Sequence, residues 1–293
     1  MTAIAPEGGA QRRGSLVGRA IRHIERRWLG VPRHEAGRIE LSYPSVDLIW
    51  WKPKTGLNFG DVLSEVIVTK ILADRGLSLK DQTDRRARLL AVGSILHFAR
   101  DGDVIWGTGV NGKMPEARHA FGTLDVRAVR GPLTREFLRK KGVDAPKIYG
   151  DPALLLPQLF PQLRANPTTP VVVVPNLHDV PRLSAEGIDH LSPRLGWNIC
   201  VEEILRAKLV VASSLHAIVV AEAFGIPARY VRFSGSENLF KYEDYVLGTG
   251  RDRLEPAASI GEACEMGGMP PIRFDARRLI DAFPLDLWRP DYT

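Results

Sequence analysis

The residues most able to carry out chemistry lie in the stretch 210–227, "VVASSLHAIVVAEAFGIP". This stretch predicts a buried strand that breaks at Ser213 and Ser214 and a helix with His216 in its first turn. The free N–H groups and the dipole of a helix N-terminus attract anions, and an imidazole there can bind or protonate one. The alternative is that a serine caps the helix and that His216 is an incidental polar residue. On this stretch alone, the alternative is favoured.

Arg130 holds the corresponding position in an earlier part of the chain. It follows the apolar run 126–129 and precedes Pro132, a residue suited to the first turn of a helix. If the strand is buried, the arginine needs a partner for its charge. A guanidinium beside free helix N–H groups is also a receptor for phosphate or carboxylate. An arginine on the surface is the alternative.

Two further segments place polar residues near predicted helix starts. In "GLNFGDVLSE", residues 56–65, Asn58 and Asp61 are most simply a turn residue and a helix N-cap, with a ligand role as the alternative. In "KYEDY", residues 241–245, Lys241 has the charge to bind an anion, but a solvent-exposed face is favoured. The chain has no HExxH, GxSxG or P-loop motif, so the corresponding hydrolase and phosphotransferase classes are disfavoured.

The elements that must position these residues alternate between apolar runs and helical patterns, which is typical of α/β proteins with mainly parallel sheets. Strands are predicted at 46–51, 89–92, 104–106, 126–129, 147–149, 171–174, 209–212 and 228–233. Helices are predicted at 61–75, 132–140 and 274–283, besides the one that carries His216. Ligands of such sheets bind at the carboxyl ends of the strands, so we expect the polar turns to face one cleft.

The pattern divides the chain into segments with different expected roles. Residues 1–40 predict a basic amphipathic helix and linker, and residues 161–170 a proline-rich linker. Between them, 41–160 form a predicted acceptor-side α/β lobe with Arg130 at the cleft. A donor-side lobe with His216 is predicted at 171–262, and a C-terminal helix and tail at 263–293.

Charge is concentrated in the first of these segments. The chain carries a net charge of +6, of which residues 1–40, with eight arginines and four glutamates, supply +4. Such a helix is suited to an anionic membrane surface, although packing on the body of the protein is equally favoured. The near-balanced remainder argues against nucleic-acid binding.

The sequence predicts a cytoplasmic protein that can associate peripherally with the inner face of the cytoplasmic membrane. No run reaches the roughly 18 apolar residues of a membrane span, and no signal peptide is apparent. Cys200 and Cys264 belong to no metal-binding spacing, so neither a disulfide nor a metal site is predicted.

Seven motifs in order give the chain a family resemblance over roughly residues 45–250. They are "NFGD" at 58–61, "GSIL" at 93–96, "VIWGTG" at 104–109, "RAVRGPLT" at 127–134, "GDPALLLP" at 150–157, "SSLHAIVVAEAFGIP" at 213–227 and "KYEDY" at 241–245. Together they resemble the polysaccharide pyruvyl transferase family, in particular its bacterial exopolysaccharide branch.

The resemblance implies two Rossmann-like lobes similar to the B-type glycosyltransferase fold. It implies phosphoenolpyruvate as donor substrate, no further cofactor, and a cyclic pyruvate ketal formed on two hydroxyls of a sugar, often lipid-linked. It also implies that Arg130 and His216 serve the donor. One departure is Ser214, where many relatives have an arginine. Lys241 or Arg232 is expected to supply that charge, unless the serine hydroxyl and the helix N–H groups suffice.

The resulting hypothesis assigns a role to each candidate residue. His216 is the general acid or a phosphate partner, and Asp61 or Asp151 positions or deprotonates the acceptor. The residues expected to bind phosphoenolpyruvate are Arg130, Ser213, Ser214, His216 and Lys241. Those expected to bind the acceptor are Asn58, Asp61 and Thr108.

Two other readings of the sequence are possible. A B-type glycosyltransferase that uses a nucleotide sugar needs a carboxylate for the ribose, and Glu222 is the candidate found, although it is expected to face another helix. A non-catalytic, membrane-associated component of polysaccharide export would instead depend on the N-terminal helix.

Overall fold

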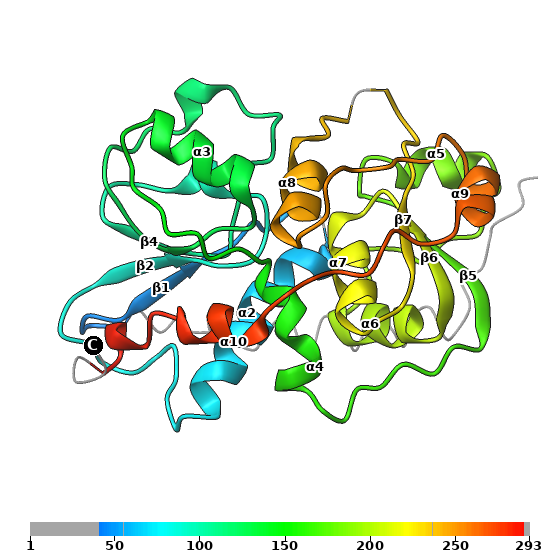
Figure 1. Ribbon diagram of the computed structural model, residues 1–293. Coiled ribbons are helices and arrows are strands. Elements are labelled where there is room, and N and C mark those ends of the chain that lie inside the picture. Colours follow the sequence, from blue (N-terminus) through cyan, green and yellow to red (C-terminus); the bar gives the residue numbers. More distant parts are fainter. Residues whose placement is uncertain (1–40, 55, 236, 290–293) are drawn as a thin grey trace, which may run out of the picture. The chain divides into compact units, whose positions relative to one another are not determined.

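Short strands form two parallel sheets, as Figure 1 shows. The computed structural model describes residues 41–54, 56–235 and 237–289, and the predicted N-terminal basic helix lies outside them. Residues Ser42–Thr293 form one compact unit. The fold is therefore a mixed α/β architecture with parallel sheets, consistent with a Rossmann-like arrangement.

The first sheet has the strand order β1-β2-β3-β4 and the second has the order β5-β6-β7. All the pairings of neighbouring strands are parallel. The strands are β1 Val46–Ile49, β2 Ala87–Leu90, β3 Asp103–Trp106, β4 Leu124–Ala128, β5 Thr169–Val174, β6 Ala207–Ala212 and β7 Ala228–Tyr230. Parallel strands need crossover connections, which here contain most of the helices.

The α-helices are α2 Phe59–Ala73, α3 Pro132–Lys140, α4 Leu156–Leu159, α5 Val180–Ala185, α6 Trp197–Leu205, α7 Leu215–Ala223, α8 Phe240–Gly248, α9 Ile260–Met266 and α10 Ala276–Asp281. Short 3-10 helices occur at Leu96–Phe98, Glu116–Arg118, Pro152–Leu155 and Leu285–Leu287. Helix α3 has the predicted bounds, with Pro132 in its first turn.

One large hydrophobic core joins the two sheets. It contains residues of β2 and β3 from the first sheet, of β5, β6 and β7 from the second, and of α2, α4, α6 and α7. Helix α2 packs against α4, α6 and the 3-10 helix Pro152–Leu155, which also contacts α7. The N-termini of α2 and α7 are thereby fixed relative to each other.

Three local predictions are wrong. The run 147–149 forms no strand, because it makes a single bridge between Tyr149 and Val129. The strand predicted at 228–233 ends at Tyr230. Asp61 does not cap α2, since Asn58 is the N-cap and Asp61 lies in the first turn. Sequence patterns locate apolar runs well, but their ends depend on which neighbour each backbone group finds.

Candidate functional site

Both serines before α7 take up structural hydrogen bonds. Ser214 is the N-cap, and its hydroxyl accepts a hydrogen bond from the N–H of Ala217. The Ser213 hydroxyl donates to Asp179 at 2.6 Å and accepts from the N–H of Asn176 at 3.0 Å. The predicted capping role of a serine is confirmed, and the hydroxyls hold the start of the helix that carries His216.

His216 faces Asp151 across a short gap between two buried atoms. Its Nε2 lies 3.7 Å from Oδ2 of Asp151, and neither atom has a hydrogen-bond partner. The other oxygen of Asp151 accepts from the N–H of Ala153 at 3.0 Å, which fixes the carboxylate at the start of the 3-10 helix Pro152–Leu155. Because buried polar atoms are nearly always hydrogen-bonded, this facing pair points to a function.

Asp61 reaches the same place from the first turn of α2. Its Oδ2 accepts a hydrogen bond from the Asn58 side chain at 2.5 Å. The preceding residue, Gly60, lies against the imidazole, because a methyl group added to it would fall 2.1 Å from Nδ1 of His216. The N-termini of α2 and α7 therefore meet at His216.

Burial shifts the pKa of all three candidate proton carriers. It raises the pKa of Asp61 to about 7, against the lowering influence of the Asn58 hydrogen bond and of Lys241. It raises the pKa of Asp151 to about 6, against the N–H of Ala153 and the charge of Arg130. It lowers the pKa of His216 to about 3, with Lys241 and Arg130 adding to the shift. At neutral pH His216 is thus neutral, and Asp61 is the group that titrates.

Arg130 is fully buried, and its guanidinium is held by groups of the protein. Its Nε donates to Asp244 at 3.2 Å, and its terminal nitrogens donate to the Ser94 hydroxyl at 2.5 Å and to the carbonyl of Val110 at 2.6 Å. Asp244 also accepts from the N–H and the hydroxyl of Thr134. The partner that a buried arginine requires is therefore Asp244, which sequence reasoning missed.

The interpretation of "KYEDY" as a solvent-exposed face is wrong. This motif lies in α8, where Tyr242, Asp244 and Tyr245 are buried. Lys241 forms an ion pair with Glu237 at 2.9 Å, and its charge influences the pKa values of Asp61 and His216. The mixed charges of the motif suggested an exposed face. In the structure Tyr242 and Tyr245 are buried, and Asp244 pairs with the buried Arg130.

Three other candidate residues are already engaged in hydrogen bonds or ion pairs within the protein. The Thr108 hydroxyl donates to the carbonyl of Gly93 at 2.8 Å, so it ties together the loops after β2 and β3. Arg232 is exposed and donates to the carbonyl of Gly235. Glu222 faces another helix as expected, accepting from Tyr245 at 2.7 Å and pairing with Arg251 at 2.5 Å. The carboxylate considered for a nucleotide ribose is therefore already engaged.

Three further findings concern metal ions, cavities and membranes. The described part of the chain contains no cluster of three or more His, Cys, Asp or Glu residues suited to a metal ion. An apolar cavity of about 470 Å³ lies at the C-terminal end of α7, lined in part by Ala223, Ile226 and Met269, away from His216 at the other end. Within the described residues, no helix is both long and apolar enough to cross a membrane.

Two known proteins are similar to this chain in sequence, and one solved structure has been matched to it. It is 27% identical over 218 residues to the uncharacterized protein L143 of Acanthamoeba polyphaga mimivirus, covering 68% of this chain and 74% of that protein. It is 33% identical over 155 residues to the succinoglycan biosynthesis protein ExoV of Rhizobium meliloti. The aligned region covers 49% of this chain and 47% of ExoV. A functionally uncharacterized protein of Klebsiella pneumoniae matches in structure with a TM-score of 0.46 and 12% identity, over 84% of this chain and all of that one.

A family model covers the region in which the candidate residues meet. The model described as polysaccharide pyruvyl transferase matches residues 58–234, more than half of the chain. This range includes Asn58, Asp61, Arg130, Asp151 and His216, and it ends before Glu237 and Lys241. The chain belongs to the polysaccharide pyruvyl transferase family and is an enzyme of that class.

Proposed function

We propose that this enzyme transfers pyruvate from phosphoenolpyruvate to two hydroxyls of a sugar, in an exopolysaccharide or its lipid-linked repeat unit, forming a cyclic ketal. The observation that carries the proposal is the facing pair of His216 Nε2 and Asp151 Oδ2, which are buried, 3.7 Å apart and without hydrogen-bond partners. Asp61 lies close enough for Asp151 to raise its pKa. Three proton carriers from different elements thus surround one point, as acid–base chemistry requires.

The reaction needs one proton delivered and two removed. The first acceptor hydroxyl adds to carbon 2 of the donor, its proton goes to a base, and the methylene carbon takes a proton to become a methyl group. The bond from carbon 2 to the phosphate oxygen then breaks, and inorganic phosphate leaves with the electron pair. The second hydroxyl attacks carbon 2 and loses its proton, which closes the ketal.

The donor itself changes the protonation of the site. His216 has a pKa of about 3 without ligand, so at neutral pH it can accept a hydrogen bond or a proton. A carboxylate and a phosphate placed beside it favour its charged form and raise its pKa toward neutrality. Donor binding therefore converts His216 into an acid suited to protonate the methylene carbon. Asp61, with a pKa of about 7, is half ionised at neutral pH and serves as the base for the acceptor.

Positive charge for the donor comes from the N-terminus of α7 and from Lys241. Arg130 contributes through its charge and by holding Ser94 and Val110, because its guanidinium is already hydrogen-bonded within the protein. These groups can stabilise the leaving phosphate, so the scheme requires no metal or cofactor. We further propose that the two sheets act as lobes like those of B-type glycosyltransferases and that residues 13–29 bring the chain to a membrane surface.

The first test measures pyruvyl transfer by the wild type and by one histidine variant. Incubation of the wild type with phosphoenolpyruvate and a lipid-linked oligosaccharide should release inorganic phosphate and leave an acid-labile pyruvate on the sugar. His216→Gln should lower kcat by about 100-fold or more, since it removes the proton carrier. His190→Gln is the control, because its ring is bonded only to the nearby carbonyl of Ile188 in the described contacts.

Ligand stabilisation separates this donor from a nucleotide sugar. A ligand at about 100 times its dissociation constant adds about 2.7 kcal/mol to the free energy of unfolding. Phosphoenolpyruvate should stabilise the wild type in thermal unfolding, and uridine diphosphate glucose should not. Stabilisation by the nucleotide sugar alone would overturn the donor assignment.

A further inference from the structure

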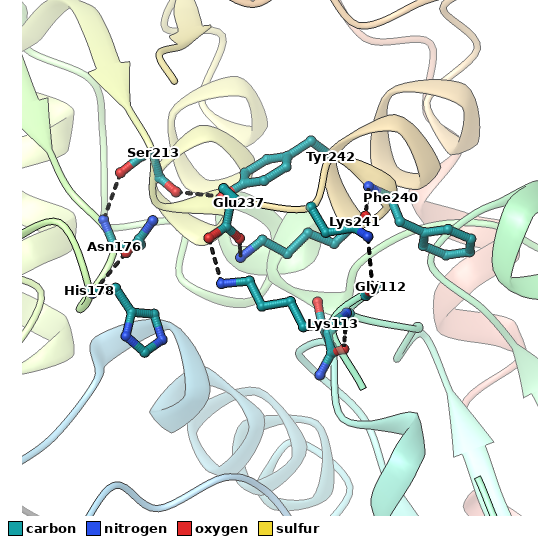
Figure 2. A network of polar contacts seen from close by, with 12 residues as sticks. Gly112, Lys113, Asn176, His178, Ser213, Glu237, Phe240, Lys241 and Tyr242 are labelled. Atoms are coloured by element: carbon teal, nitrogen blue, oxygen red, sulfur yellow. Dashed lines mark hydrogen bonds and ion pairs between the residues drawn. The ribbon is translucent and has the colours of Figure 1, made fainter. Parts of the chain in front are cut away.

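Two lysines and a glutamate form an ion-pair cluster beside the candidate site. Lys113 lies in the loop after β3, Lys241 lies in the first turn of α8, and Glu237 lies between β7 and α8. In Figure 2, dashed lines join the carboxylate of Glu237 to both ammonium groups. Oε2 lies 2.5 Å from Nζ of Lys113, and Oε1 lies 2.9 Å from Nζ of Lys241. Glu237 is buried, whereas the Lys113 side chain is 36% exposed. The cluster thus joins loops that follow strands of two different sheets.

This cluster and the proton carriers share an electrostatic environment. The charge of Lys241 lowers the pKa of both Asp61 and His216, and Lys113 and Arg130 act on Lys241 in turn. Burial raises the pKa of Glu237, but Lys241 and Lys113 outweigh burial, so the pKa lies below its ordinary value and the carboxylate is ionised at neutral pH. Glu237 therefore carries a full negative charge near the place where an anionic donor would bind.

The side chains of Arg130, Lys113 and Lys241 are each already paired with a carboxylate of the protein. Arg130 is paired with Asp244, and Lys113 and Lys241 are paired with Glu237. A polyanion such as phosphoenolpyruvate must therefore exchange with one of these carboxylates to reach a cation. Binding without exchange would place like charges side by side at a buried position, which is strongly unfavourable.

Glu237 is the carboxylate that can exchange. Asp244 lies within α8, is fully buried and also accepts from the N–H of Thr134 at 2.9 Å and from its hydroxyl at 2.6 Å. Glu237 precedes α8 and is held by two lysine side chains, each with several rotatable bonds. Rotation of the Glu237 side chain exposes both ammonium groups, and none of the described hydrogen bonds joins its carboxylate to the backbone.

We infer that Lys113 and Lys241 form an anion-binding subsite in which Glu237 takes the place of a carboxylate or phosphate group and leaves when that group binds. The identity of the anion as phosphoenolpyruvate rests on the proposed function. The exchange keeps both lysines paired in the free and the bound enzyme, and the displaced carboxylate of Glu237 must turn toward solvent, because a buried charge without a partner is unfavourable. It also favours strongly charged anions, because a weak competitor does not displace Glu237.

The test is a calorimetric titration of the full chain with phosphoenolpyruvate and, separately, with inorganic phosphate. Glu237→Gln keeps the shape of the side chain and removes the internal competitor, so both anions should bind about tenfold more tightly. Lys113→Gln removes one cation, so both should bind about tenfold more weakly. Glu243→Gln, on the same region of the chain and with the same change in charge, should bind like the wild type.

The outcomes separate the subsite from the donor. If phosphate affinity follows the expected order but phosphoenolpyruvate binds to none of the proteins, the subsite stands and the donor assignment falls. If Glu237→Gln binds phosphate no more tightly than Glu243→Gln does, or if Lys113→Gln binds like the wild type, the inference is overturned. If Glu237→Gln fails to fold, Lys113→Gln decides the question, because its side chain is partly exposed and tolerates substitution.

Discussion

At the scale of single residues, burial determines the protonation of the site more than residue type does. Histidine ordinarily titrates near neutrality and aspartate well below it, yet here the pKa of His216 is about 3 and that of Asp61 about 7. In the proposed function, the usual assignment of acid and base changes until the anionic donor restores charge to the histidine. We therefore expect the ionisation of Asp61 to limit activity at low pH.

Asp61→Asn should make the protein more stable than the wild type at pH 8. The pKa of Asp61 rises from 3.8 to about 7 on folding, so the folded state binds more protons between these values. The contribution of the neutral Asp61 carboxyl to the free energy of unfolding is fully present below pH 3.8 and is lost as the pH rises through about 7. Asparagine carries no charge to desolvate, so its free energy of unfolding at pH 8 should exceed that of the wild type by on the order of 2 kcal/mol.

Urea unfolding at pH 5 and pH 8 measures this difference. The gap between variant and wild type should widen toward pH 8, while pyruvyl transfer is lost at both pH values. Asp47→Asn is the control, since Asp47 is an exposed residue of β1. An Asp61→Asn protein less stable than the wild type at pH 8 would contradict the buried-carboxyl explanation.

At the scale of elements, the approach of two helix N-termini builds the site. Gly60 in the first turn of α2 lets that helix lie against the imidazole of His216 in the first turn of α7. The serines before α7 and Asn58 before α2 fix these ends by hydrogen bonds. A glycine at this helical position costs stability in an isolated helix, so its presence is explained by the close contact.

Gly60→Ala should displace His216 and abolish activity. The added methyl group would lie 2.1 Å from Nδ1 of His216, so the helix or the ring must move, at a cost of about 1–3 kcal/mol. Gly261→Ala is a matched control, because Gly261 is also the second residue of a helix, α9, and its nearest neighbour is 3.8 Å away. Thermal unfolding and phosphate release measure both effects. Equal behaviour of the two variants would refute the contact.

At the scale of the whole molecule, polar ties join segments that are distant in the sequence. Arg130 pairs with Asp244, Arg127 pairs with Asp286, and the Trp106 indole donates to the carbonyl of Leu279 at 2.9 Å. Figure 1 shows the helix α10, near the C-terminus, on the side of the first sheet. These ties supplement the core shared by the two sheets, so the halves of the site keep their relative position.

Asp244→Asn should destabilise the protein by about 3 kcal/mol, because it leaves the charge of Arg130 buried without its partner. The double variant Arg130→Met with Asp244→Leu removes both charges and should recover most of that loss. Chemical unfolding measures both, with Asp252→Asn at an exposed position as control. Should Asp244→Asn be as stable as Asp252→Asn, the pair contributes nothing to joining the halves. Although the double variant recovers stability, it should bind phosphoenolpyruvate more weakly than the wild type does, since it lacks the arginine charge.

The sequence by itself determined the α/β class, most strands and the family, because hydrophobic periodicity and short motifs depend on neighbouring residues. It also selected His216, Asp61, Asp151 and Arg130 as candidates, because polar turns at the carboxyl ends of parallel strands are expected to face one cleft. It did not indicate Asp244, Glu237 or Lys113, because an ion pair between residues more than 100 positions apart leaves no local pattern.

Only the tertiary structure decided the partners and the burial of these residues. The interpretation of Arg130 as a receptor for an anion did not anticipate that its guanidinium is hydrogen-bonded within the protein. The reversal of the pKa order between His216 and Asp61 arises from burial, at the point where the first turns of α2 and α7 meet. Residue type fixes what a side chain can do chemically, whereas desolvation and partners from distant segments fix which of those options it takes.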